Sequence, residues 1–67
     1  MNTRQIGEVI KSRRGVLSID QRTLSEISGV AVHTLSNIEA GNGNPTVKSL
    51  GKVLTALGME LRVEVQR

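Results

Sequence analysis

The sequence contains no cysteine and no aromatic residue. Without cysteine, the chain cannot form a disulfide, a cysteine-based zinc site or a thiol nucleophile. Without aromatic side chains, it lacks the stacking platforms that hold single-stranded nucleic acids and RNA loops. The one histidine, His33, has no carboxylates placed to complete a metal site. We therefore expect neither a metal nor another cofactor.

Long apolar runs are also absent. No stretch approaches the ~20 residues that a helix needs to span a bilayer, and the chain does not open with a signal peptide. A cytoplasmic protein with no membrane partner is therefore expected. The carboxylates are scattered, and there is no glycine-rich phosphate loop or nucleophile constellation. For that reason we do not expect an enzyme.

What the chain does have is an excess of positive charge. Nine Lys and Arg residues against six Asp and Glu residues give a formal net charge of +3. Five of the cations lie in the first 22 residues: Arg4, Lys11, Arg13, Arg14 and Arg22. Such clustering is compatible with an ordinary solvated surface and with a face that binds an anionic partner. Because aromatic residues are missing, duplex DNA is the better candidate among nucleic acids.

Four segments have the apolar spacing of helices. The predicted helices run from Thr3 to about Val16, over Gln21–Ser28, from about Val32 to Ala40, and from Val47 up to Gly58. Suitable N-caps are Asn2 or Thr3, Asp20 and Thr46, and suitable helix ends are Gly29, Gly41 and Gly58. The second and third helices are expected to point Leu24, Ile27, Leu35 and Ile38 inward. The residues that follow the helical spacing in the first and fourth helices are Ile6, Val9, Ile10, Arg13, Leu17, Val47, Leu50, Val53, Leu54 and Leu57.

The segment MELRVEVQ, residues 59–66, alternates apolar and polar residues instead and predicts a β-strand. A lone strand leaves its backbone groups unpaired, and no other segment of the chain has this pattern. The strand is therefore expected to pair with the same strand of a second copy. Its apolar face (Met59, Leu61, Val63 and Val65) is expected to close over the fourth helix. The expected fold is mostly α: a compact four-helix domain over residues 1–58 and one C-terminal β-strand over residues 59–67 that pairs antiparallel with a second protomer.

The pattern also restricts the register of this dimer strand, whose pairing residues are Met59, Leu61, Arg62, Val63, Glu64 and Val65. Apolar residues must face apolar residues, which excludes odd slips. Centring on Arg62 would set like charges against each other. Centring on Val63 sets Arg62 against Glu64, and centring on Leu61 sets Glu60 against Arg62. We favour Val63, because it uses the strand out to Gln66.

The second and third helices are short and are joined by only three residues, 29–31, which is the helix-turn-helix arrangement. The outward face of the third helix carries Val32, His33, Thr34, Ser36 and Asn37. An ordinary solvated helix face usually carries more Lys and Glu than this one. Short side chains of this kind suit contact with base edges in the major groove, where Asn pairs with adenine and Val touches the thymine methyl.

The motifs Q-x-x-L-S-E, G-V-x-x-x-T-L-S-N-I-E-x-G and N-P-T-V-x-S-L resemble the phage repressor/Cro-type helix-turn-helix family, also called the xenobiotic-response-element class. The resemblance covers nearly all of residues 6–59. The tail TALGMELRVEV is similar to that of the HipB-type branch, small antitoxin-repressors in which a C-terminal strand follows the fourth helix.

The resemblance implies roles for individual residues. DNA base contacts fall on Val32, His33, Thr34 and Asn37. DNA phosphate contacts fall on Gln21, Ser36, Asn42, Gly43, Asn44 and Lys48. A structural ion pair between the first and third helices falls on Arg14 and Glu39.

The chain also departs from the family. Ala31 stands where the family often has a capping Ser or Thr, Val32 where it often has a polar or basic residue, and the loop after Gly41 is neutral where it is often basic. These departures predict weaker contact per half-site or a different operator. Gly15 replaces what is usually a long polar residue, and the sequence suggests no function for it.

The function expected from the resemblance is a sequence-specific transcriptional repressor. It would bind a palindromic double-stranded DNA operator as a homodimer, as the antitoxin of a HipB-like type II toxin-antitoxin pair that also binds its HipA-like toxin kinase. Two alternatives remain open. One is a stand-alone repressor without a toxin, and the other is a protein-interaction module that no longer binds DNA.

Overall fold

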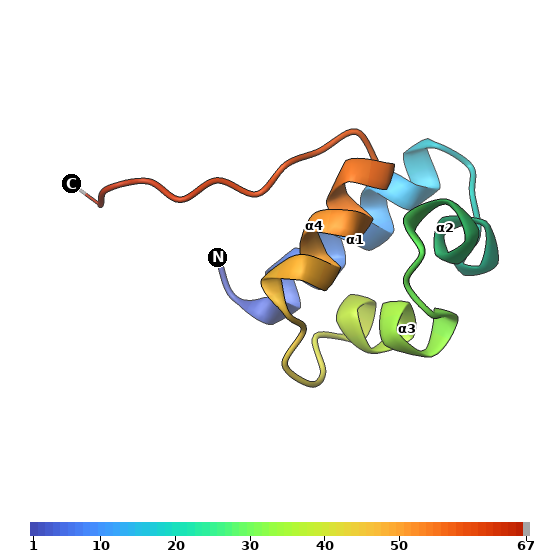
Figure 1. Cartoon of the computed structure of the whole chain (residues 1–67), viewed down its shortest axis with the longest axis horizontal. Coiled ribbons are helices and arrows are strands. Elements are labelled where there is room, and N and C mark those ends of the chain that lie inside the picture. The colour runs from blue at the N-terminus through green and yellow to red at the C-terminus, as the bar shows by residue number, and fades with distance from the viewer. Residues whose placement is uncertain (67) are drawn as a thin grey trace.

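Four helices make up the regular structure of the computed structural model, which describes residues 1–66. They are α1 (Thr3–Val16), α2 (Gln21–Ser28), α3 (Val32–Ala40) and α4 (Val47–Ala56), as Figure 1 shows. The four predicted helices are therefore confirmed. Within the described part of the chain, no helix is long and apolar enough to cross a membrane.

The helix boundaries follow from local hydrogen bonding. At the start of α1, the Gln5 backbone N–H donates to the Asn2 side chain at 2.8 Å, and the Asn2 backbone N–H donates to the Gln5 side chain at 2.9 Å. This reciprocal capping box selects Asn2 as the N-cap. Asp20 and Thr46 cap α2 and α4 by accepting backbone hydrogen bonds, whereas Ala31 caps α3 with no side-chain bond.

Glycines end three of the helices as predicted. Gly29, Gly41 and Gly58 have φ of 75°, 76° and 73°, in the left-handed region that disfavours residues with a Cβ. At Gly29 the chain turns so sharply that Val30 points back into the core. The turn between α1 and α2 instead uses Ser18, a non-glycine residue whose φ is positive at 57°.

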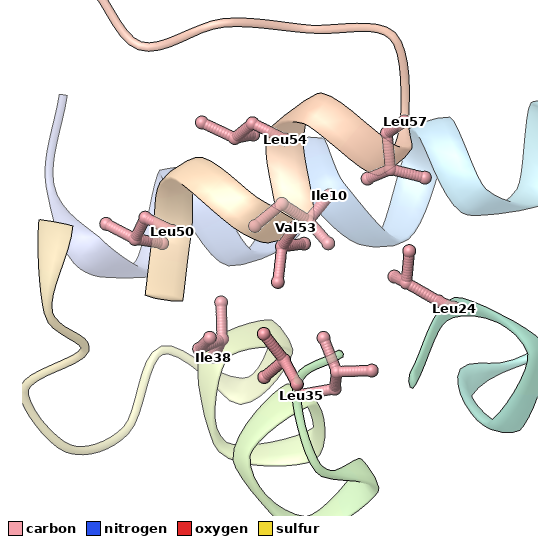
Figure 2. Packing of buried hydrophobic residues seen from close by; sticks show 9 residues of the cluster. Ile10, Leu24, Leu35, Ile38, Leu50, Val53, Leu54 and Leu57 are labelled. Carbon is pink, nitrogen blue, oxygen red and sulfur yellow. The ribbon is translucent and has the colours of Figure 1, made fainter. Parts of the chain in front are cut away.

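The core lies where the four helices meet, and it is entirely aliphatic (Figure 2). Its buried members are Ile10, Leu24, Val30, Leu35, Ile38, Leu50, Val53, Leu54 and Leu57. Around α3, Leu35 and Ile38 point toward α1 and α4, so one face of this helix is held inside and the other is left outside. Ile6, Ile19, Ala56 and Met59 pack against the margin of the core.

Three of the apolar residues that follow the helical spacing are exposed rather than buried. Ile27 is 58% exposed, whereas Val30, beyond the Gly29 turn, is buried in the core. Leu17 is 40% exposed, because it follows the last turn of α1 and Ile19 packs on the core in its stead. Val47 is 72% exposed. It is the first residue of α4, and helical side chains tilt toward the N-terminus, away from the core in this case.

Residues 59–66 leave the end of α4 as an extended segment (Figure 1). No strand is assigned among residues 1–66, since a ladder needs a second strand and a single chain offers none. Met59 remains close to the helices, and its backbone N–H donates to the Leu54 carbonyl at 2.8 Å. The β-strand and its pairing thus stay a prediction. Arg67, the last residue of the predicted dimerisation strand, lies outside the described residues.

One glycine sets how closely α1 approaches α3. A Cβ on Gly7 would collide with the backbone oxygen of Ile38 and would lie 2.7 Å from that of Glu39. Because both atoms belong to the backbone of α3, neither moves aside without shifting the helix. Gly7 therefore permits the packing of α1 on the last turn of α3. Gly15, by contrast, has open space around its Cβ position.

These two glycines give a matched pair of variants. Gly7→Ala should lower the free energy of unfolding by ~1–3 kcal/mol, as overpacking does. Gly15→Ala should raise it by up to ~1 kcal/mol, since alanine favours the helix and meets no neighbour. Urea unfolding followed by circular dichroism measures both. A Gly7→Ala variant as stable as the parent would show that α1 does not need this close approach.

Candidate nucleic-acid interface

A bidentate ion pair fixes α3 in its place. The Arg14 guanidinium donates through Nε to Glu39 Oε2 and through Nη2 to Glu39 Oε1, both at 2.8 Å. Its Nη1 donates to the Ile19 carbonyl at 3.1 Å, in the segment that leads into α2. The Glu39 side chain is only 5% exposed and that of Arg14 17%. The structure thus joins the two residues expected to pair, and the pair connects α1 with α3.

Gln21, the first residue of α2, adds a third helix to this network. Its Nε2 donates to Glu39 Oε1 at 3.3 Å. The resemblance implies a phosphate contact for Gln21, and in the structure its amide supports Glu39. At this N-terminus of α2 the Asp20 carboxylate accepts a hydrogen bond from the Thr23 backbone N–H at 2.8 Å.

The network keeps both partners charged. Burial by itself raises the pKa of Glu39, but the hydrogen bonds from Arg14 and Gln21 outweigh burial and hold that pKa below its ordinary value. The same hydrogen bond to Glu39 raises the pKa of Arg14. An ionised carboxylate with charge-assisted hydrogen bonds is therefore the state present at neutral pH.

With its inner side held, α3 presents short side chains to solvent. Val32 is 41% exposed, His33 and Ser36 are exposed, and Thr34 and Asn37 are half-buried. Asn37 Nδ2 lies 3.5 Å from His33 Nε2, one helical turn earlier. The expected base-contacting residues are thus accessible on one helix, with donors, acceptors and a methyl group among them.

The loop after α3 folds back toward this face. The Asn42 backbone N–H donates to the Asn37 carbonyl at 2.9 Å, and the left-handed Gly41 makes that return possible. As a result, one cleft is lined by Thr34, Asn37, Ile38, Asn42, Gly43, Asn44 and Pro45. Two of the expected base contacts and three of the expected phosphate contacts therefore share a cleft.

The other expected phosphate contacts lie outside this cleft. Ser36 and Lys48 are exposed on α3 and on the first turn of α4, and Gln21 begins α2. Conversely, Pro45 lines the cleft although the sequence did not single it out. Its position directly after the Asn-Gly-Asn loop was the available signal. No cluster of three or more metal-ligating side chains occurs among residues 1–66.

The chain is similar to a known protein family and to a known protein. The family model described as "Helix-turn-helix" matches residues 10–63. A Haemophilus influenzae protein described as an uncharacterized HTH-type transcriptional regulator is 40% identical over 58 residues. The match covers 87% of this chain and 58% of that protein, so this chain spans somewhat more than half of its relative's length.

The pKa of Glu39 makes the stability of the domain depend on pH. Because the folded-state pKa lies below the ordinary value of 4.5, the stabilisation is fully present above pH 4.5 and is lost as the pH falls through the folded-state pKa. Glu39→Gln should therefore cost ~1–3 kcal/mol of unfolding free energy at pH 7, and this cost should shrink as the pH is lowered below 4.5. Urea unfolding over a series of pH values measures the change.

Glu8→Gln serves as the control for that experiment. Glu8 pairs with Arg4 on the surface at 3.6 Å, with both side chains mostly exposed, and exposed pairs contribute ~0–1 kcal/mol. If Glu39→Gln lost no more stability than Glu8→Gln at pH 7, the ion pair would not be what holds α3.

Proposed function

This chain belongs to the helix-turn-helix family of the Cro/C1 repressor type, and from that premise we propose that it is a sequence-specific DNA-binding transcriptional repressor. It acts as a homodimer on a palindromic operator in double-stranded DNA. The observation that carries the proposal is the cleft in which Thr34 and Asn37 of α3 meet the Asn42–Asn44 loop. A helix that reads bases needs a phosphate-contacting segment beside it, because phosphate contacts set the position of the helix on the duplex. The Asn42–Asn44 loop is such a segment in this proposal.

In this proposal α3 enters the major groove. Asn37 pairs with an adenine edge, Thr34 and His33 exchange hydrogen bonds with bases, and Val32 touches a thymine methyl. The backbone is held by Gln21, Ser36, Asn42, Gly43, Asn44 and Lys48. The loop residues contribute neutral donors rather than cations, so part of the attraction comes from the net charge of +3.

Dimerisation through residues 59–67 brings two copies of the DNA-reading helix α3 into one assembly. A twofold axis makes the two strands antiparallel, and two copies of α3 then read half-sites about one helical turn, ~34 Å, apart. In the register centred on Val63, the partner's Glu64 faces Arg62. Within one chain, Arg62 Nε already donates to Glu60 Oε1 at 2.8 Å, so the guanidinium would bridge two carboxylates across the pair of strands.

The tail further suggests an antitoxin role. The resemblance of residues 55–65 to HipB-type antitoxin-repressors supports a HipA-like toxin kinase as a second protein partner. Co-expression tests this: a kinase encoded beside the gene should be toxic alone and harmless together with this chain. A stand-alone regulator would leave such a kinase toxic.

Two variants on α3 test base reading. Thr34→Ala and Asn37→Ala should each weaken binding to the preferred operator by ~1–3 kcal/mol and leave binding to unrelated DNA nearly unchanged. Thr55→Ala, at an exposed position of α4, is the matched control and should bind like the parent. Fluorescence anisotropy with labelled duplexes measures all three. If both α3 variants kept parental operator affinity, α3 would not be the reading helix.

The same titrations separate DNA binding from a protein-interaction module. Each neutralised phosphate should add ~0.9 to the slope of log affinity against log salt concentration. A flat slope would favour the module that no longer binds DNA.

Removal of the tail tests the dimer. A chain truncated after Gly58 should sediment as a monomer, lose operator affinity and unfold at a lower temperature, because strand pairing and apolar cover are lost together. Analytical ultracentrifugation at micromolar concentration measures the first effect. A truncated chain that still sediments as a dimer would contradict the proposal, as would a monomeric full-length chain.

A further inference from the structure

The apolar residues of the C-terminal segment divide into two groups. Met59 packs against the core and Leu61, which is 44% exposed, lines a pocket on the helices. Val63 and Val65 are 97% and 89% exposed. Figure 1 shows the segment running past the helices so that its end stands away from them. The first half therefore covers its own chain, whereas the second half covers nothing within it. This differs from the sequence-based expectation that the whole apolar face closes over α4.

Beside this segment, α1 carries an apolar groove on its outer side. One pocket is lined by Met1, Val9, Val16 and Met59 among others. An adjoining pocket is lined by Met1, Ile6, Val9, Leu54, Met59 and Leu61. Because Met1, Val9 and Met59 belong to both, the pockets form one groove. Met1 and Val16 are 86% and 69% exposed, so the groove has apolar surface left to cover.

We propose that this groove binds the partner's Val65, so that each protomer buries part of the exposed apolar surface of the other. The proposal rests on the proposed homodimer. In the register centred on Val63, the partner's Val65 lies directly opposite Leu61. Opposed residues of antiparallel strands point to the same face and lie ~5 Å apart. Since Leu61 points into the groove, the partner's Val65 points into it as well.

The arrangement accounts for both exposed groups at once. Val65, which is 89% exposed in its own chain, gains an apolar site, Val63 faces its counterpart in the partner, and the groove on α1 gains a cover. It also commits the partner strand to the α1 side of the segment rather than the α4 side. Val47, which is 72% exposed on α4 and lines neither pocket, marks a surface that the partner's tail should not reach.

Disulfide trapping tests the assignment, since the chain has no native cysteine to interfere. Val9→Cys and Val65→Cys are made in separate chains of different size, mixed, and oxidised mildly. A disulfide requires Cα atoms within about 7 Å, so a covalent dimer of the unlike chains is expected. Using two singly substituted chains excludes a link within one chain. Val47→Cys mixed with Val65→Cys is the control and should give only a trace of linked product.

A second measurement uses the exposed tail, where substitution does not threaten the fold. Val65→Asp should raise the dimer dissociation constant about tenfold or more, as expected for placing a charge where a valine is buried. Val47→Asp, the same substitution on the α4 surface that the partner's tail should not reach, should leave it unchanged. Equal effects of the two substitutions would overturn the proposal, and so would trapping of Val65→Cys by Val47→Cys as readily as by Val9→Cys.

Val63→Cys separates this inference from the proposed function. In the favoured register Val63 faces itself, so this single variant should form a disulfide with its own copy. If Val63→Cys chains link and the parent sediments as a dimer, but Val9→Cys and Val65→Cys do not link, the homodimer stands and the groove assignment fails. A parent chain that sediments as a monomer would instead refute the homodimer itself.

Discussion

Glu39 has to be held by a cation if α3 is to keep its place. Its side chain is 5% exposed, and an unpaired carboxylate in such surroundings costs several kcal/mol. Arg14 is this cation, and its planar guanidinium donates two hydrogen bonds of 2.8 Å to the carboxylate. Gln21 supplies another hydrogen bond, and the Ile19 carbonyl holds the third nitrogen of Arg14. Three helices therefore depend on one carboxylate.

The exposed face of α3 follows from the same constraint. Leu35 and Ile38 are buried on one side of the helix, and the ion pair keeps the last turn of α3 against α1, where Gly7 allows the two backbones to approach. What remains outside are the short side chains of Val32, His33, Thr34 and Asn37. The core has no aromatic rings to bury. Its stability therefore depends on this close packing of helix backbones and aliphatic side chains.

The C-terminal segment differs from α3, because a single chain offers it no partner strand and leaves its last valines uncovered. Residues 59–66 have no ladder partner in a single copy, and Val63 and Val65 project into solvent. An open edge with exposed alternating valines invites pairing with another chain. The proposed homodimer satisfies the backbone through strand pairing and the side chains through the groove on α1. Assembly, reading of a twofold operator and stability would thus depend on the same eight residues.

The sequence by itself determined the parts of this protein that depend on near neighbours. The four helices, the caps at Asn2, Asp20 and Thr46, and the ends at Gly29, Gly41 and Gly58 are set by hydrogen bonds and φ values within a few residues. The apolar spacing also identified most of the core. The family resemblance located Arg14 and Glu39, because these are the positions at which it implies an ion pair between the first and third helices.

Only the tertiary structure decided which apolar residues are covered. Ile27 and Val47 have the spacing of core residues but lie outside, since Val30 turns inward and α4 begins beyond the core. The cleft shared by α3 and the Asn42–Asn44 loop depends on the return of the chain at Gly41. The close approach of α1 to the carbonyls of α3 at Gly7 could not be predicted from the apolar spacing. The need for a glycine there becomes visible only when the backbone of α3 lies against it. Spacing along a helix determines which residues share a face, and what covers that face is determined by segments distant in the sequence.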